Sequence, residues 1–326
     1  MDNFKPEQTN YRPVSSPTNP RFSGIRTFMR LPYVIDLKNV DFAIVGVPFD
    51  TGATYRVGAR FGPSAIRDES FLLKPYNPVQ CINLFDVCSG VDYGDLPTIP
   101  GYLPEAHKLI EESAAKIFGC GVTPVFLGGD HSVSLPLLRA AAANFGKLAL
   151  IHFDSHNDLH KGYFGGKDTH GTPFRRALEE NLIDPTRSIQ IGIRGSLYDA
   201  DVQNEAAEAG FQVFTAPEIH RQGLARVLEA IRERVGASRA YLTFDIDFAD
   251  PAYAPGTGTP VIGGFTSAQC LELVQGLAGL NIISFDVVEV LPAHDPGGIT
   301  ALLAAGIVYE FLSLIALSRQ ARINNS

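Results

Sequence analysis

The feature of this sequence that most restricts its fold is a regular alternation of short apolar runs with longer helical patterns. From about residue 40 onward, runs rich in β-branched and aromatic residues are separated from helical segments by glycine or proline. Two runs, LALIHF and AYLTF, are apolar or aromatic almost throughout, as expected for strands buried on both faces. Strands that alternate with helices form βαβ crossovers, so the sequence predicts a mainly parallel sheet covered by helices on both faces.

The positions of these runs define the expected elements. Strands are predicted over residues 42–48, 123–127, 148–153, 189–193, 211–214, 240–244 and 282–288. Helices are predicted over about residues 104–118, 133–144, 172–181, 222–235, 266–277 and 299–316. Because no repeat or change of composition divides the chain, we expect one α/β domain over residues 21–326, after a flexible, proline-rich arm over residues 1–20.

Composition limits the partners and the compartment. The chain of 326 residues carries a formal net charge of −8, so it lacks the basic surface that a nucleic-acid-binding protein needs. It has no run of about 20 unbroken apolar residues that would span a membrane. Charged residues such as Lys5 and Glu7 stand where a signal peptide would be apolar, and the four cysteines form no CxxC pair. We therefore expect a cytoplasmic protein with reduced thiols that binds neither nucleic acid nor membrane.

Three of the predicted strands lead into short segments that are rich in aspartate or histidine. Parallel α/β proteins bind their ligands beyond the carboxyl ends of the strands, so these ends are the places to look for a site. One end reads GGDH, where two glycines allow a sharp turn before His131. A second reads HFDSHND, in which Asp154, His156 and Asp158 share one face of an extended backbone. The third reads FDID, in which two aspartates again share a face.

These strand ends together offer two imidazoles and four carboxylates as metal ligands. The candidate ligands are His131, Asp154, His156, Asp158, Asp245 and Asp247. Carboxylate oxygens with a few imidazoles suit Mn²⁺, and Ni²⁺, Co²⁺, Fe²⁺ and Zn²⁺ are also compatible. Six ligands are too many for one tetrahedral zinc but suit two divalent cations that share carboxylates, roughly 3.5–4 Å apart. Without metal, four crowded carboxylates would repel one another.

Five other histidines are expected at surface positions or as satisfied core residues. These are His107, His152, His160, His220 and His294. Among them, His160 stands close to the predicted metal-binding segment, two residues after Asp158.

The motifs resemble those of the ureohydrolase (arginase–agmatinase) family. GGDH, FDSHND and FDID match the three metal-binding segments of that family. The similarity extends roughly from residue 20 to residue 318 in order. It includes RVGARFGP at 56–63, THG at 169–171, DPAYAPGTGTP at 250–260 and VVEVLPAHDP at 287–296.

The resemblance implies a fold, a set of roles and an assembly. The fold would be a single three-layer α/β/α domain with a central, eight-stranded, mainly parallel sheet, and the assembly a homotrimer or homohexamer. One metal would bind His131, Asp154, Asp158 and Asp245, and the other would bind Asp154, His156, Asp245 and Asp247. His170 would correspond to a proton-shuttling histidine, and Glu289 to the glutamate that holds the guanidinium group of the substrate.

The substrate is expected to be a short ω-guanidino acid, hydrolysed to urea and an amine. Residues 20–32, 163–165 and 170–176 resemble the guanidinobutyrase and guanidinopropionase branch of the family. Candidate contacts for the substrate tail are Arg56, Asn157, His160, Lys161 and Tyr163. For Arg56 and Lys161, a solvated surface position is at least equally compatible with the sequence. Departures from the branch at residues 157, 159–162 and 248–249 keep other substrates open: agmatine, free guanidine, or a substituted guanidine or biguanide such as metformin, with nickel as the alternative metal.

Two readings of another class compete with this one. A histone-deacetylase-like zinc amidase on a related sheet would need a single transition metal. An inactive scaffold subunit would assemble with an active partner chain in a hetero-oligomer. The complete ligand set argues against the second reading.

Overall fold

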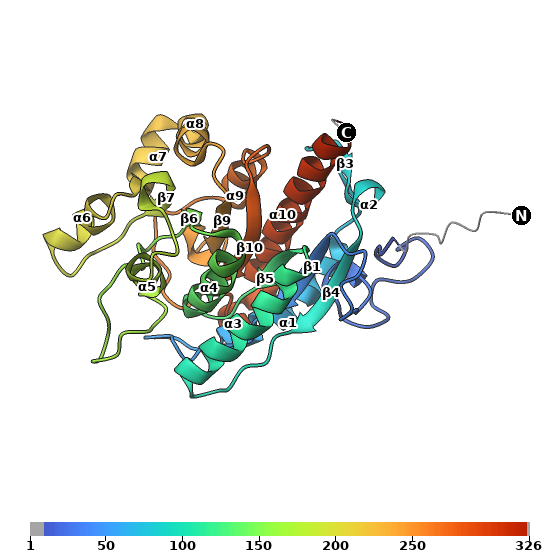
Figure 1. Ribbon diagram of the computed structural model, residues 1–326, viewed down its shortest axis with the longest axis horizontal. Helices are drawn as coiled ribbons and strands as arrows, with labels where there is room; N and C mark the ends of the chain where they lie inside the picture. The colour runs from blue at the N-terminus through green and yellow to red at the C-terminus, as the bar shows by residue number, and fades with distance from the viewer. Residues whose placement is uncertain (1–9, 325–326) are drawn as a thin grey trace, which may run out of the picture.

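A computed structural model of the chain describes residues 10–324, which are organised around one eight-stranded sheet (Figure 1). The strand order is β4-β1-β5-β10-β9-β6-β7-β8, and every neighbouring pair is parallel. The strands are β1 (Phe42–Gly46), β4 (Gly90–Asp95), β5 (Thr123–Leu127), β6 (Ala149–Phe153), β7 (Ile189–Ile193), β8 (Gln212–Thr215), β9 (Ala240–Asp245) and β10 (Ile282–Val288). The predicted parallel sheet is confirmed. A separate antiparallel pair joins β2 (Tyr76–Asn77) to β3 (Ile82–Asn83).

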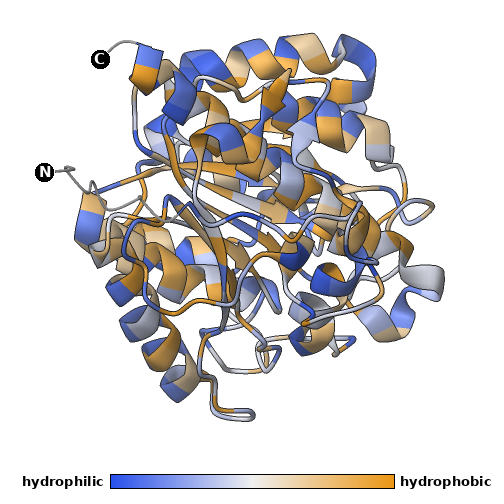
Figure 2. Ribbon diagram, turned by 90° about the vertical axis from the view of Figure 1, so that its right-hand side faces the viewer, coloured by the Kyte–Doolittle hydropathy of each residue, from blue (hydrophilic) through white to orange (hydrophobic). Residues whose placement is uncertain are grey.

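Helices cover both faces of this sheet, which confirms the three-layer architecture. One face packs against α3 (Leu103–Gly119), α4 (Ser134–Phe145) and α5 (Pro173–Glu179). The other packs against α1 (Gly62–Glu69), α7 (Ala216–Gln222), α8 (Leu224–Val235), α9 (Ser267–Gln275) and α10 (Ile299–Asn324). Alternate strand residues supply the two cores, since side chains alternate between the faces of a strand. Figure 2 shows apolar strands inside a layer of helices that carry polar residues on their outer surfaces.

The sequence prediction missed one strand of the main sheet, the short pair β2 and β3, and several short helices. The edge strand β4 reads GVDYGD, and its aspartates and glycines resemble a turn more than a strand. Asp92 in β4 is buried because the guanidinium group of Arg67 donates to both of its carboxylate oxygens, at 2.8 and 3.0 Å. Tertiary pairing therefore overrides the weak strand propensity. The missed helices are α1, α7, α2 (Leu84–Val87) and α6 (Ala200–Glu208).

Helix α10 is the longest element and lies in the core. By length and composition alone its segment could cross a membrane, but 78% of its most apolar window is buried inside the protein. Buried residues such as Phe311 and Leu312 belong to the core under the sheet, and the Phe311 ring stacks on Phe285 of β10 at 4.8 Å. The apolar character of α10 is thus explained by its packing, as in the core helix of a large α/β domain.

Part of the expected N-terminal arm lies outside the described residues, namely residues 1–9. The part that the structure describes runs beside the edge of the sheet. The carbonyl of Tyr11 accepts a hydrogen bond from the Gly90 amide at 2.9 Å, and the Val14 amide donates to the Arg30 carbonyl at 3.2 Å. These contacts place Tyr11 next to β4 and Val14 next to Arg30.

Candidate metal centre and active site

The three aspartate-rich and histidine-rich segments meet at the carboxyl end of the sheet. They follow β5, β6 and β9, which lie close together in the strand order with only β10 between β5 and β9. The turn after β5 requires glycine, because a Cβ atom on Gly129 would lie only 1.7 Å from the carbonyl oxygen of Phe49. The turn leads directly into His131, the first residue of a short 3₁₀ helix.

One half of the cluster is centred on His131. Its Nδ1 atom lies 3.1 Å from Asp154 Oδ2, 3.0 Å from Asp158 Oδ2 and 3.3 Å from Asp245 Oδ2. Its other ring nitrogen, Nε2, lies 2.8 Å from the hydroxyl of Thr243 on β9. A hydroxyl partner at Nε2 fixes the ring and leaves Nδ1 facing the three carboxylates.

The other half is centred on His156. Its Nδ1 atom lies 3.1 Å from Asp247 Oδ2 and 3.5 Å from Asp154 Oδ1. The second oxygen of Asp247 accepts hydrogen bonds from Ser155, from the amide at 3.0 Å and from the hydroxyl at 2.7 Å. Asp154 reaches both histidines through its two oxygens, so the structure brings all six predicted ligands together.

Unpaired buried atoms indicate that this cluster fits a metal ion. Within residues 10–324, neither His131 Nδ1 nor Asp247 Oδ2 makes a hydrogen bond of normal geometry, although both are buried and lie within 3.3 Å of the side chains described above. Burial raises the pKa of the Asp245 carboxyl well above its usual range, and the neighbouring Asp247 and Asp154 raise it further. Carboxylates and ring nitrogens packed this closely in a buried place require compensating positive charge. The cluster is therefore able to hold metal.

His170 and Glu289 form a pair beside the cluster. The two side chains meet at 2.9 Å between His170 Nδ1 and Glu289 Oε1, and the same oxygen accepts the His131 amide at 2.9 Å. Burial lowers the pKa of His170, but the Glu289 carboxylate outweighs it and raises the pKa to about 9. The second oxygen of Glu289 is buried and has no hydrogen-bond partner in the part of the chain that the structure describes. A carboxylate oxygen left free in this way is a binding position for a cationic donor.

The backbone at Glu289 and Asp158 is in the left-handed region, with φ values of 63° and 51°. Such a conformation in a residue other than glycine costs about 1–2 kcal/mol. The Glu289 amide donates to the carbonyl of Gly129 at 2.8 Å, which ties the end of β10 to the turn after β5. Strain of this kind is retained where the surrounding structure holds a side chain in a required position.

Two of the predicted substrate-tail residues lie beside His170. The rings of His160 and Tyr163 are 5.1 Å apart, and both approach Gly171, where a Cβ atom would lie 3.0 Å from the Tyr163 ring. Lys161, between them in sequence, is exposed. Asn157 is buried and already engaged, because its Oδ1 accepts the Leu159 amide at 3.1 Å.

Arg56 lies on a loop that approaches Glu289. A Cβ atom on Gly258 would lie 3.4 Å from both the Arg56 carbonyl oxygen and the unpaired oxygen of Glu289. The Arg56 guanidinium group lies 5.5 Å from the centre of the Tyr55 ring. The loop is held at its far end by Asp50, which accepts the Gly58 amide at 2.8 Å.

Several residues around the site were not singled out by the sequence. Arg194, just after β7, donates to the carbonyls of Asp247 at 2.6 Å and Val261 at 2.9 Å, and so fixes the segment that follows β9. The sequence offered one indication of this role, because Arg194 directly follows the end of a predicted strand. His152 was expected at a surface or satisfied core position. It is fully buried, and its Nε2 lies 2.7 Å from Asp154 Oδ2.

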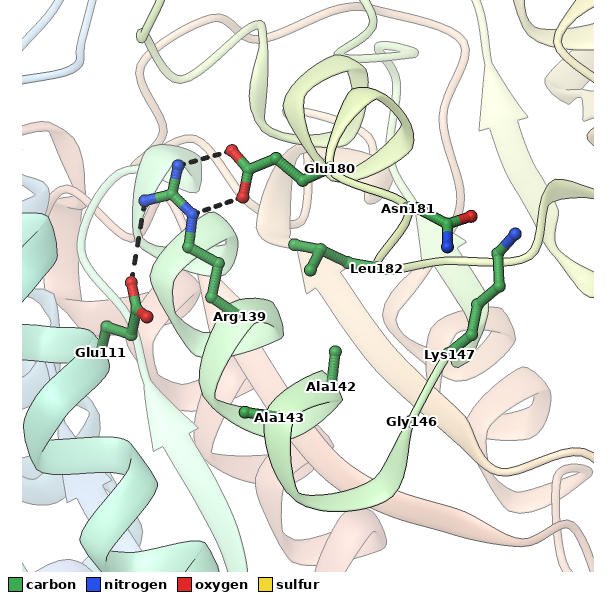
Figure 3. Close-up of a pocket in the computed structure, with 9 residues that line it drawn as sticks. All are labelled: Glu111, Arg139, Ala142, Ala143, Gly146, Lys147, Glu180, Asn181 and Leu182. Atoms are coloured by element: carbon green, nitrogen blue, oxygen red, sulfur yellow. Dashed lines mark hydrogen bonds and ion pairs between the residues drawn. The ribbon is translucent and has the colours of Figure 1, made fainter.

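A surface hollow lies elsewhere, away from the metal cluster (Figure 3). It is lined by Arg139, Lys147 and Glu180 among others, and its volume is about 620 Å³. Lys147 precedes β6, so this hollow opens at the amino ends of the strands, opposite to the metal cluster. Glu180 pairs with both arms of the Arg139 guanidinium, at 2.6 and 2.7 Å, which leaves that cation already neutralised.

The fold and the cluster define a class of protein: a three-layer α/β/α protein with a metal-binding group of histidines and aspartates at the carboxyl end of its parallel sheet. The chain belongs to the arginase family, whose profile matches residues 40–313. This assignment confirms the resemblance seen in the sequence and argues against the zinc-amidase alternative.

Named relatives cover almost the whole chain. A guanidinobutyrase of Pseudomonas aeruginosa is 44% identical over 94% of this chain and 97% of its own length. A guanidinopropionase of the same organism is 45% identical over 94% of this chain and 96% of its own. Among solved structures, a proclavaminate amidino hydrolase from Streptomyces clavuligerus matches with a TM-score of 0.88 and 40% identity, covering 92% of this chain and 100% of its own.

Proposed function

We propose that the chain hydrolyses a C–N bond of a short ω-guanidino acid, such as guanidinobutyrate or guanidinopropionate, to give urea and an amine. The chain is a hydrolase of the arginase family that acts on guanidino compounds. The observation that carries the proposal is the free, buried oxygen of Glu289 beside the histidine–aspartate cluster. It provides a negatively charged hydrogen-bond acceptor for a guanidinium group at the edge of a metal site.

The proposed cofactor is a pair of divalent metal ions, with Mn²⁺ preferred and Ni²⁺ as the alternative. The pair would be held by His131, Asp154, His156, Asp158, Asp245 and Asp247. When bound, such a pair lowers the pKa of a water molecule from about 15.7 toward 7 and so supplies a nucleophile at neutral pH.

Glu289 is proposed to orient the substrate. Its Oε1 is held in place by the His131 amide and by His170, so Oε2 has a fixed direction. A guanidinium group that donates to Oε2 would be held with its carbon next to the cluster. Fixing the carbon in this way lowers the entropic part of the barrier, since guanidinium is a poor electrophile.

His170 is proposed to deliver the proton that the leaving amine needs. Its Nε2 lies 2.7 Å from the Thr54 hydroxyl and accepts the Thr54 amide at 3.1 Å. The protonated ring can donate from Nε2 to the hydroxyl, and the neutral ring can accept from the amide. Nε2 therefore has a donor on Thr54 when the ring is neutral and an acceptor on Thr54 when it is protonated, and the amide hydrogen bond is given up in the protonated state.

A His170→Ala variant is expected to lower turnover by about a hundredfold or more, because general acid catalysis contributes roughly 10²–10⁴-fold. Metal content should stay as in the wild type, since none of the contacts of His170 is with a proposed ligand side chain. Urea release and elemental analysis measure the two quantities. Wild-type turnover in the variant would remove His170 from the mechanism.

The same pair predicts how stability depends on pH in the metal-free chain. The His170 pKa is raised from its usual 6.5 to about 9 by Glu289. The stabilisation of the folded state by the His170–Glu289 pair is fully present below pH 6.5 and is lost as the pH rises through about 9. At about 1.4 kcal/mol per pKa unit, the difference in unfolding free energy between wild type and His170→Ala should shrink by up to about 3 kcal/mol over this range. Denaturant unfolding at several pH values measures it, and a constant difference would contradict the pairing.

The identity of the substrate needs a direct assay. The wall formed by His160 and Tyr163 and the Arg56 loop are the proposed contacts for the substrate tail, with Lys161 and Asn157 as further candidates. Agmatine, free guanidine, and a substituted guanidine or biguanide such as metformin are the alternatives. Protein loaded separately with Mn²⁺ and with Ni²⁺ should be assayed on all of these and on the two guanidino acids. The proposal fails if neither acid is hydrolysed.

We further propose a cytoplasmic homotrimer or homohexamer, with residues 21–326 as one catalytic domain and residues 1–20 as an arm. The alternative is a hetero-oligomer in which this chain needs, or supports, a partner subunit. Purifying the chain alone, measuring its mass in solution and assaying it for urea release would distinguish the two. Activity of the isolated chain would exclude the scaffold alternative.

A further inference from the structure

A row of polar side chains crosses the sheet directly beneath the metal cluster. In the strand register, His152 of β6 pairs with Gln190 of β7 on one side and Thr243 of β9 on the other. All three are fully buried. Asp154 comes two positions after His152, just past the end of β6, and Asp245 comes two positions after Thr243 in β9, so both stand above this row on the same face of the sheet. Burying polar side chains costs free energy unless they are hydrogen-bonded, so a buried row of this kind indicates a specific role.

Hydrogen bonds within the row fix which nitrogen of His152 carries the proton. The Gln190 amide nitrogen lies 2.7 Å from the Asn157 carbonyl oxygen and 3.0 Å from His152 Nδ1. The Asn157 backbone carbonyl can only accept a hydrogen bond, so the Gln190 side chain must turn its NH₂ group toward it. The flipped side chain would place the Gln190 oxygen against the carbonyl oxygen. The same NH₂ then donates to His152 Nδ1, which must be unprotonated.

The proton of the neutral ring is therefore on Nε2, which lies 2.7 Å from Asp154 Oδ2. The His152 ring is also held by packing, since its centre lies 4.3 Å from that of Phe174. Asp154 is the carboxylate whose oxygens reach both His131 and His156. A donor aimed at Oδ2 fixes the rotation of this carboxylate and still leaves lone pairs free for a cation.

We propose that His152, oriented by Gln190, is a positioning residue that holds Asp154 for metal binding. This inference rests on the proposed metal centre and goes beyond it, because His152 and Gln190 are not among the proposed ligands. Residues that donate to metal-binding side chains raise metal affinity roughly 10–100-fold. His152 also lies close enough to His131, Asp154 and Asp158 to be a ligand itself. The donor geometry at Nε2 favours positioning, and the experiment separates the two roles.

The test measures the dissociation constant and the stoichiometry of Mn²⁺ binding to the chelator-stripped full chain. His152→Phe keeps a ring but removes the donor, and it should weaken binding roughly 10–100-fold with the number of sites unchanged at saturation. His152→Gln can place an amide NH₂ near the position of Nε2 and should restore most of the affinity. Gln190→Leu should weaken binding in the same direction as His152→Phe. His294→Phe, at an exposed position, is the matched control and should bind as the wild type.

Each of the other outcomes would overturn the inference. Wild-type affinity in both His152→Phe and Gln190→Leu would mean that the row does not act on Asp154. Loss of a whole metal equivalent in both His152→Phe and His152→Gln would make His152 a ligand. A loss in His152→Phe that glutamine does not restore, with Gln190→Leu unchanged, would reduce the effect to packing. If His152→Phe does not fold, the Mn²⁺ affinities of the other two variants test the inference. Gln190→Leu should bind more weakly than the wild type, and His152→Gln should keep most of the wild-type affinity. A wild-type chain that binds neither Mn²⁺ nor Ni²⁺ would overturn the proposed metal centre together with this inference.

Discussion

An Asp154→Ala variant is expected to bind no metal in either half of the cluster and to lose at least roughly 10⁴-fold in turnover. Asp154 contacts the two ring nitrogens of the cluster with separate oxygens, at 3.1 Å from His131 and 3.5 Å from His156. Removing it breaks both halves at once. It also leaves the buried donor of His152 without its acceptor, which adds a cost in stability of about 1–3 kcal/mol.

The comparison with Asp247→Ala makes this prediction specific. Asp247 contacts the ring of His156, and no described contact joins it to the ring of His131. Its removal should therefore cost one metal and leave the other. Elemental analysis after equilibration with Mn²⁺ counts the metals, and thermal unfolding with and without Mn²⁺ gives a second readout, since a metal at 100 times its Kd adds about 2.7 kcal/mol.

The matched control for both is Asp201→Ala, because Asp201 is an exposed aspartate in the first turn of α6. It should keep the full metal content and turnover of the wild type. Two metals per chain in Asp154→Ala would refute its place at the centre of the cluster. Equal losses in Asp154→Ala and Asp247→Ala would show that the two halves do not form separately.

The inner strands of the sheet could be predicted because their burial dictates their composition. β5, β7 and β10 begin and end at the predicted residues. They have helices on both faces and strands on both edges, so most of their positions are apolar, and buried polar residues such as Gln190 are exceptions. The edge strand β4 has a neighbour on one side only, and its Asp92 and Asp95 are stabilised by Arg67, which is distant in sequence. An ion pair with a residue distant in the sequence cannot be recognised from the residues of the strand alone.

The predicted ligands could be placed together because each motif follows a strand and parallel strands end at one edge. The order of the strands was not needed for that conclusion. What the sequence could not provide was the contacts between motifs. Glu289 accepts the amide of His131, 158 positions away, and Gln190 contacts His152 across a strand register. Registers are set by the packing of whole elements, so roles that depend on them become visible only in three dimensions.

A Glu289→Gln variant is expected to lower kcat/KM by about a thousandfold, with the metal content unchanged. The substitution keeps the shape of the side chain and an oxygen to accept the His131 amide, but it replaces the free carboxylate oxygen by an NH₂ group. That group would face the N–H donors of the substrate instead of accepting from them. Losing one partner of a buried, charged hydrogen-bonded pair costs about 3–5 kcal/mol, and about 4 kcal/mol corresponds to a thousandfold.

Glu310→Gln is the matched control for this variant. Glu310 is also buried, on α10, and its carboxylate accepts from Asn77 and Gln275 at 3.0 Å. Replacing it should affect stability but not kcat/KM, because none of these residues belongs to the proposed site. An unchanged kcat/KM in Glu289→Gln would contradict the proposed grip on the guanidinium group. Loss of metal would instead make Glu289 part of the cluster.

The pH dependence separates the two contacts that Glu289 makes. Its carboxylate raises the pKa of His170 to about 9. In metal-free Glu289→Gln that attraction is gone, so the His170 pKa should fall below its wild-type value while Asp130 and Asp158 still raise it, as measured by NMR titration of the ring. If Glu289 acted on the reaction only through His170, the double variant with His170→Ala would be no slower than His170→Ala alone. If Glu289 binds the substrate independently of His170, the double variant should be slower than His170→Ala, because the guanidinium group would lack its acceptor.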